Sequence, residues 1–141
     1  MFTLIIPAYN EESSLKNSSF LEKITAELFR SSFEGFELLI VDDGSNDNTL
    51  KILKDFQKNY DFIKVFSNAK NKGYGSTLKF GISKAKFDTI IITDIDGTYP
   101  SSDVLKILNI YIDSQNRFDN PIDMVVGQRT GKNYWESVFK F

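Results

Sequence analysis

Apolar runs alternate with amphipathic stretches along the chain, and this pattern predicts the secondary structure. Short apolar runs bounded by turn residues predict buried strands. Apolar residues at helical spacing, such as Leu21, Ile24 and Leu28, predict helices with one buried face. The predicted elements are strand 2–7, helix 12–31, strand 36–42, helix 47–59, strand 62–67, helix 75–86, strand 89–94, helix 102–114 and strand 123–127. Because strands alternate with helices, we expect an α/β fold with a mostly parallel sheet flanked by helices.

Polar, turn-forming segments lie where predicted strands end. Pro-Ala-Tyr-Asn-Glu-Glu (7–12) follows the first strand, and Asp-Asp-Gly-Ser (42–45) closes the second. Asn-Lys-Gly-Tyr-Gly (71–75) opens the third helix, and Asp-Ile-Asp-Gly (94–97) follows the fourth strand. Open α/β sheets bind ligands in a crevice at the carboxyl ends of their strands. The sequence therefore predicts a ligand site built from these four segments.

Asp94 and Asp96 are the most informative pair. Side chains two residues apart on an extended chain point the same way, so both carboxylates aim from the strand end toward one point. Hard oxygen ligands of this kind suit Mg²⁺ or Mn²⁺, which takes the rest of its shell from water and a phosphorylated substrate. The alternative is an ordinary acidic turn, since aspartate, glycine and proline are all turn residues.

The composition of the chain excludes several kinds of site and partner. A chain of 141 residues predicts one domain. It contains no cysteine and no histidine, which excludes disulfides, thiolate metal sites and an imidazole base and leaves carboxylates for acid, base or metal work. A net charge of −2 without a basic block argues against nucleic-acid binding. With no apolar run near membrane-spanning length and no signal-peptide pattern, we expect a cytoplasmic domain, placed at most on the cytoplasmic face of a membrane.

The four segments together resemble the nucleotide-binding half of family 2 glycosyltransferases of the GT-A fold, and most of all the polyprenyl-phosphate (dolichyl-phosphate) sugar transferases. Val-Gly-Gln-Arg (126–129) adds to the resemblance, which spans nearly the whole chain. It implies transfer of a sugar from a UDP- or GDP-sugar, with inversion and with Mg²⁺ or Mn²⁺, onto an acceptor such as a polyprenyl phosphate. Such reactions belong to cell-wall or glycolipid biosynthesis.

The resemblance also implies roles for individual residues. The implied nucleotide-binding residues are Pro7, Ala8, Tyr9, Glu11, Asp43, Lys72 and Asp94. Asp94 and Asp96 form the DXD motif that holds the metal, and Asp96 and Arg129 are the implied catalytic residues, with Arg129 clamping a phosphate.

Each of these segments also has a simpler, purely structural interpretation. Glu11 and Glu12 also suit the start of a helix. In the simpler interpretation, Asp42 orders the turn that follows it, and residues 71–75 form a flexible turn before a helix. Arg129 is then a solvated side chain.

The last segment predicts a missing partner. Residues 130–141 carry Tyr134, Trp135, Val138 and Phe139 with no evident covering element, so we expect the domain to be incomplete and any membrane contact to come from a missing C-terminal part or a partner. A complete minimal domain is the alternative. Three other functions remain open: a nucleotide-sugar-binding fragment without transferase activity, a sugar-phosphate nucleotidyltransferase and a receiver-like signalling domain. The segment 7–12 lacks the glycine-rich loop of the second, and the Asp-x-Asp-Gly turn does not suit the third.

Overall fold

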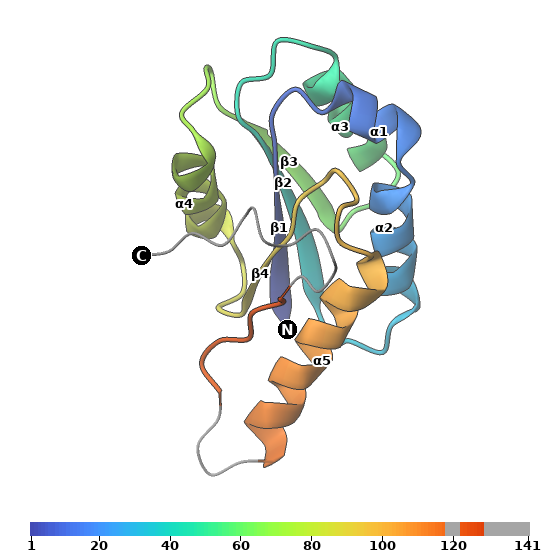
Figure 1. Cartoon of the computed structure of the whole chain (residues 1–141), viewed down its shortest axis with the longest axis vertical. Coiled ribbons are helices and arrows are strands. Elements are labelled where there is room, and N and C mark those ends of the chain that lie inside the picture. The colour runs from blue at the N-terminus through green and yellow to red at the C-terminus, as the bar shows by residue number, and fades with distance from the viewer. Residues whose placement is uncertain (118–121, 129–141) are drawn as a thin grey trace. The chain divides into compact units, whose positions relative to one another are not determined.

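The computed structural model describes residues 1–117 and 122–128. The chain divides into two compact units, Met1–Val104 and Leu105–Phe141. The first unit holds all the strands of the described residues. The helices and strands, shown in Figure 1, are β1 (Phe2–Ala8), α1 (Glu12–Asn17), α2 (Phe20–Arg30), β2 (Phe36–Asp42), α3 (Thr49–Gln57), β3 (Ile63–Ser67), α4 (Tyr74–Lys84), β4 (Ile90–Ile92) and α5 (Ser101–Arg117).

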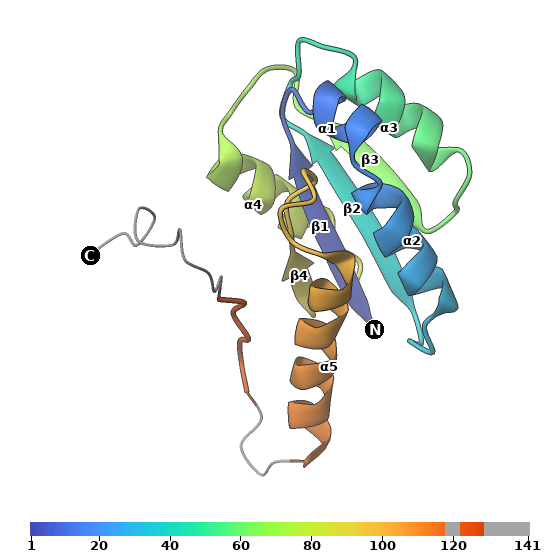
Figure 2. The same cartoon turned by 45° about the vertical axis from the view of Figure 1, so that its right-hand side comes forward.

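The first unit is a parallel sheet with helices on both faces, as the sequence predicts. The strand order is β3-β2-β1-β4, and every pairing is parallel. Helix α4 lies on one side of the sheet, and α2 and α3 lie on the other in both views (Figures 1 and 2). The order runs from β1 to β3 in one direction, and β4 returns to the opposite side of β1. Such a reversal is where open α/β sheets leave a crevice at the carboxyl ends of their strands.

The two central strands lie at the centre of the core. Leu4, Ile5 and Ile6 of β1 and residues 38–41 of β2 have no measurable solvent exposure. Strands covered on both faces need continuous apolar runs, which is why the sequence pattern locates them so closely. Gly81 of α4 allows close packing, because a Cβ there would lie 2.9 Å from the Ile5 side chain.

The pairing of β4 is shorter than the predicted strand 89–94. On the side of β1 that faces β4, the Thr3 N–H donates to Thr89 O at 2.9 Å, and Ile5 O accepts a hydrogen bond from the Thr93 N–H at 3.2 Å. The next bond of a parallel ladder needs the N–H of residue 7, and Pro7 has none. The chain therefore leaves the sheet just before Asp94.

Two other expectations are corrected. The predicted helix 12–31 is two helices, because Ser18 is extended (φ −100°, ψ 139°) and its hydroxyl accepts a hydrogen bond from Phe20 N–H at 3.1 Å. Serine side chains compete in this way with the helical backbone. The predicted strand 123–127 is also wrong: residues 122–128 form no regular structure and pair with no strand of the described residues.

Candidate functional site

A pocket of about 270 Å³ opens at the carboxyl ends of β1 and β2 and the turn after β4. This volume is near the lower end of the range of about 300–1,000 Å³ for small-molecule sites. Its lining residues are Pro7, Ala8, Tyr9, Glu11, Asp43, Asn71, Gly73, Tyr74, Thr77, Asp94, Ile95 and Asp96. The structure thus brings together in the first unit the four segments that the sequence singled out.

The loop after β1 supplies one wall. Pro7 and Ala8 belong to the strand itself, paired with Val41 and Asp42 of β2. Tyr9 and Glu11 follow, and Asn10 between them has a left-handed backbone (φ 54°). Tyr9 and Glu11, on either side of Asn10, both line the pocket.

Asp43 anchors a second wall. Its carboxylate is almost fully buried and accepts hydrogen bonds from Asn68 Nδ2 at 2.8 Å, Lys72 N–H at 3.0 Å and Gly73 N–H at 2.8 Å. Burial opposes ionisation, but these bonds and one with Thr77 hold the pKa of Asp43 below its usual value. Asp43 therefore fixes the segment that opens α4, in addition to lining the pocket.

Asp42 has a different role from its neighbour. Its carboxylate accepts hydrogen bonds from Ser45 N–H at 3.3 Å and from the Ser67 hydroxyl at 2.9 Å. The expectation that Asp42 orders the turn after β2 is confirmed.

Asp94 and Asp96 lie where the chain has left the sheet, and both line the pocket. The exposed Asp96 accepts hydrogen bonds from Thr98 N–H at 2.8 Å and from the Thr98 hydroxyl at 2.6 Å. Gly97 completes this turn with φ 77°, and a Cβ there would lie 2.7 Å from the Ser18 hydroxyl. The break between α1 and α2 therefore makes room for the Asp94–Asp96 turn.

The donor set fits a hard divalent cation whose shell is completed by a ligand. Two carboxylates are present, and the described residues contain no group of three or more acidic, histidine or cysteine side chains that could hold a metal alone. Mg²⁺ characteristically binds through one or two carboxylates together with waters and substrate phosphates.

The start of α4 contributes residues that sequence reasoning missed. Tyr74 and Thr77 both line the pocket, three residues apart on one helix face. Burial, with the charge of Asp94 as a lesser cause, raises the pKa of the Tyr74 phenol. The signal was present, because Tyr74 stands inside the Asn-Lys-Gly-Tyr-Gly segment.

Two predicted site residues, Lys72 and Arg129, are not among the described residues that line the pocket. Lys72 holds its place through its backbone N–H, and its side chain is not part of the pocket lining. Arg129 lies outside the described residues. Among the helices of the described residues, none is long and apolar enough to cross a bilayer.

The chain is similar in sequence to known glycosyltransferases. The family model of Glycosyl transferase family 2 matches residues 3–137. The chain is 32% identical over 112 residues to the dolichyl-phosphate beta-glucosyltransferase of Homo sapiens, a match that covers 74% of this chain and 34% of that protein. It is 30% identical over 141 residues to the UDP-N-acetylglucosamine–dolichyl-phosphate N-acetylglucosaminyltransferase of Methanococcus voltae, covering 89% of this chain and 51% of that protein.

A solved structure shows the fold. The mannosyltransferase PcManGT from Pyrobaculum calidifontis, in complex with GDP-Man and Mn²⁺, matches with a TM-score of 0.59 at 22% identity, over 74% of this chain and 30% of that chain. The expected GT-A fold is confirmed by this likeness. The chain spans about a third to a half of the length of the curated relatives named above.

Proposed function

Because the chain belongs to glycosyl transferase family 2, we propose that it binds a UDP- or GDP-sugar with Mg²⁺ or Mn²⁺ and serves the transfer of that sugar. Residues 1–141 act as a single nucleotide-sugar-binding and catalytic domain in this proposal. The acceptor is a polyprenyl phosphate, since the two curated relatives are named for dolichyl phosphate.

The main support for the proposal is the charge of the residues that line the pocket. Among the described residues that line it, four are acidic (Glu11, Asp43, Asp94 and Asp96), and none is lysine or arginine. A diphosphate placed among carboxylates is repelled unless a cation lies between them. The lining therefore favours a ligand that arrives with a divalent metal, and the structural relative that binds GDP-Man does so with Mn²⁺.

We assign roles on this basis. Asp94 and Asp96 hold the metal, which stabilises the charge that develops on the leaving diphosphate. Pro7, Ala8, Tyr9 and Glu11 bind the nucleoside part, together with Asp43. Lys72 and Arg129 are retained as phosphate contacts on the resemblance alone.

The proposed reaction is a single displacement. The acceptor oxygen bonds to the anomeric carbon from the face opposite the diphosphate, whose oxygen leaves with the electron pair, and the configuration inverts. A phosphate acceptor is already anionic, so the step needs no strong general base. This suits a chain without histidine.

A titration tests the donor site. We expect calorimetry with UDP and GDP to show binding of at least one nucleotide with Mn²⁺ present and little binding with EDTA. Asp96→Asn should abolish the Mn²⁺-dependent part while the melting temperature stays the same, because Asp96 is exposed. Asp61→Asn, which changes an exposed aspartate outside the pocket, is the matched control. Equal affinity in Mn²⁺ and EDTA would refute the metal role.

Transfer is tested separately with labelled UDP- and GDP-sugars, Mn²⁺ and polyprenyl phosphate in detergent. Repeated turnover to glycolipid supports the full activity. Donor binding without transfer would instead support the alternative of a nucleotide-sugar-binding domain.

A further inference from the structure

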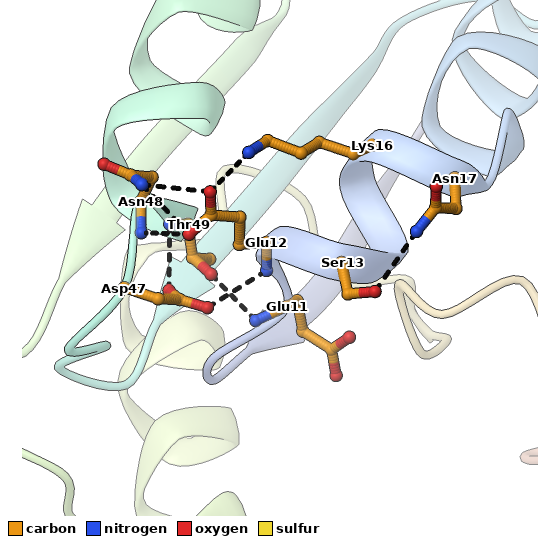
Figure 3. Close-up of polar contacts among 8 residues, drawn as sticks. All are labelled: Glu11, Glu12, Ser13, Lys16, Asn17, Asp47, Asn48 and Thr49. Atoms are coloured by element: carbon orange, nitrogen blue, oxygen red, sulfur yellow. Dashed lines mark hydrogen bonds and ion pairs between the residues drawn. The ribbon is translucent and has the colours of Figure 1, made fainter.

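The loops that leave β1 and β2 meet at the first turns of α1 and α3, beside the pocket (Figure 3). Neither helix is capped by the side chain of its own N-cap residue, Glu11 for α1 and Asn48 for α3. Helix α1 has only six residues, too few to be stable by its own hydrogen bonds. Its place must therefore come from contacts with other parts of the chain.

Side chains at the start of each helix, or just before it, bind the first N–H groups of the other. Glu11 N–H donates to Thr49 Oγ1 at 2.7 Å, and Glu12 N–H donates to Asp47 Oδ2 at 3.2 Å. In return, the Glu12 carboxylate accepts hydrogen bonds from Asn48 N–H at 2.9 Å and from the Asn48 amide at 2.9 Å. These four side chains, Glu12, Asp47, Asn48 and Thr49, form what we call the interloop network.

Asn10 extends this connection toward the pocket. Its N–H donates to Ser45 Oγ at 2.9 Å, and its side-chain oxygen accepts a hydrogen bond from Asn46 N–H at 2.9 Å. Three consecutive backbone N–H groups, those of residues 10–12, are thus bound to the loop after β2 or to the first residue of α3. The interloop network holds the backbone, and Figure 3 shows the Glu11 carboxylate pointing away from it.

Glu12 is ionised as it makes these bonds. The Lys16 ammonium, together with the Asn48 hydrogen bonds, lowers the pKa of Glu12 to about 2. Neither Glu12 nor Asp47 lines the pocket, whereas Tyr9 and Glu11 do. Any effect of Glu12 or Asp47 on a bound nucleotide must therefore pass through the loop.

Building on the proposed function, we propose that Glu12 and Asp47 are positioning residues for the nucleotide: Asp47 accepts the Glu12 N–H, the Glu12 carboxylate binds Asn48, and the two contacts together hold the loop that carries Tyr9 and Glu11 in the pocket. The loop is ordered before the nucleotide arrives, so binding does not have to offset the entropy of ordering it. Loss of the Asp47 carboxylate releases the Glu12 N–H, and loss of the Glu12 carboxylate releases Asn48. Either loss loosens the contact between the two loops and weakens nucleotide binding without touching the nucleotide.

Glu12→Ala and Asp47→Ala test this inference, and Asp55→Ala is the matched control. Asp55 also pairs with a nearby lysine on a helix surface, Lys58 at 2.6 Å, but has no bond to either loop. With Mn²⁺ and the nucleotide that the wild type binds, we expect Glu12→Ala and Asp47→Ala to lower affinity about tenfold, in line with the loss of hydrogen bonds to a charged group. Asp55→Ala should stay within about twofold of the wild type, as expected for an exposed ion pair.

Hydrogen exchange separates positioning from a merely structural role. Measured well below the melting temperature of each variant, the N–H groups of residues 10–12 should exchange faster in Glu12→Ala and Asp47→Ala but not in Asp55→Ala. Glu12→Gln keeps one acceptor oxygen for Asn48 and should restore part of both the protection and the affinity.

The outcomes separate this inference from the proposed function. A lower melting temperature with unchanged nucleotide affinity would overturn the positioning role alone. A loss of affinity with unchanged exchange would overturn it too, because Glu12 would then act directly on the ligand. If the wild type binds no nucleotide, the proposed function fails, and the inference fails with it.

Discussion

Replacement of Asp43 by alanine tests how the pocket depends on one buried carboxylate. The side chain is 4% exposed and accepts hydrogen bonds from Asn68, Lys72 and Gly73 at 2.8–3.0 Å. The three donors differ in what replaces the lost partner. Lys72 and Gly73 are exposed, so water can bind their N–H groups, whereas Asn68 is only 6% exposed and its amide keeps only the longer bond to Thr77 Oγ1 at 3.2 Å.

These differences set the size of the effect. A buried donor left without its charged acceptor costs about 1.5–3 kcal/mol, and each bond that water replaces costs about 0.5–1 kcal/mol. Relief of the buried charge offsets part of this, so we expect a loss of about 2–4 kcal/mol in the free energy of unfolding. For a chain of this length, that corresponds to a fall of roughly 5–15 °C in melting temperature. Asp43→Asn keeps one oxygen acceptor and should lose less than Asp43→Ala.

The pH dependence of the same variants is an independent check. The folded-state pKa of Asp43 is lowered, so the ionised carboxylate stabilises the folded state above the unfolded pKa, about 3.9 for aspartate. That contribution is lost as the pH falls through the folded-state pKa. The difference in stability between the wild type and Asp43→Asn should therefore be constant above about pH 5 and shrink below about pH 4.

Thermal unfolding followed by circular dichroism between pH 3 and pH 8 measures both effects. A melting temperature of Asp43→Ala within about 2 °C of the wild type would refute the reasoning, since the expected loss is several times larger. Ligand titration adds the functional half. If Asp43 contacts the nucleoside, the variant weakens nucleoside and diphosphate binding by similar factors, and a loss confined to the diphosphate would contradict that assignment.

Two further predictions concern stability. Glu37 is 3% exposed and accepts hydrogen bonds from Thr3, Lys64 and the Lys86 N–H, so Glu37→Gln should cost about 1–3 kcal/mol in chemical denaturation. Although burial opposes ionisation, these bonds lower the pKa of Glu37, so the cost should diminish below about pH 4; a cost that grows in acid would contradict this sign. Gly44→Ala should lower the melting temperature sharply, because Gly44 has φ 70° and a Cβ would lie 2.5 Å from the Lys70 carbonyl carbon. Gly75→Ala is the control: nothing lies within 4 Å of its Cβ position in α4, so it should stabilise by about 0.5–1 kcal/mol, and equal losses in the two variants would refute the steric argument.

The strands were predictable because burial on both faces leaves a direct mark in the sequence. The predicted strand 36–42 has the observed bounds of β2, and the prediction 2–7 misses only Ala8 of β1. Local backbone competition was less visible. The serines after Asn17 end α1 early, and helical spacing on either side of that break gives no sign of it. Residues 123–127 have the composition of a strand, but a strand exists only where a partner pairs with it.

The site was predictable as a set of segments but not as a set of contacts. Seven of the nine predicted site residues line the pocket, because parallel strands bring their carboxyl ends to one edge. Glu12 shows what sequence cannot supply. By local rules, an acid at that position favours its own helix, yet its carboxylate accepts hydrogen bonds from the residue that precedes α3. The partner is 36 residues away in the chain and becomes a neighbour only when β1 and β2 pair.

Pro7 explains why Asp94 and Asp96 lie outside the sheet. Polar strand ends at one edge make a pocket only if the strands separate there, and full pairing of β4 with β1 would keep Asp94 in the sheet. Pro7 offers no N–H at the position where the next bond would form, and the pairing of β4 stops at Ile92. The segment from Asp94 to Asp96 then turns toward the Ser18 break between α1 and α2, where Gly97 fits. A single missing donor in β1 therefore lets two carboxylates leave the sheet and face the loop that follows the same strand.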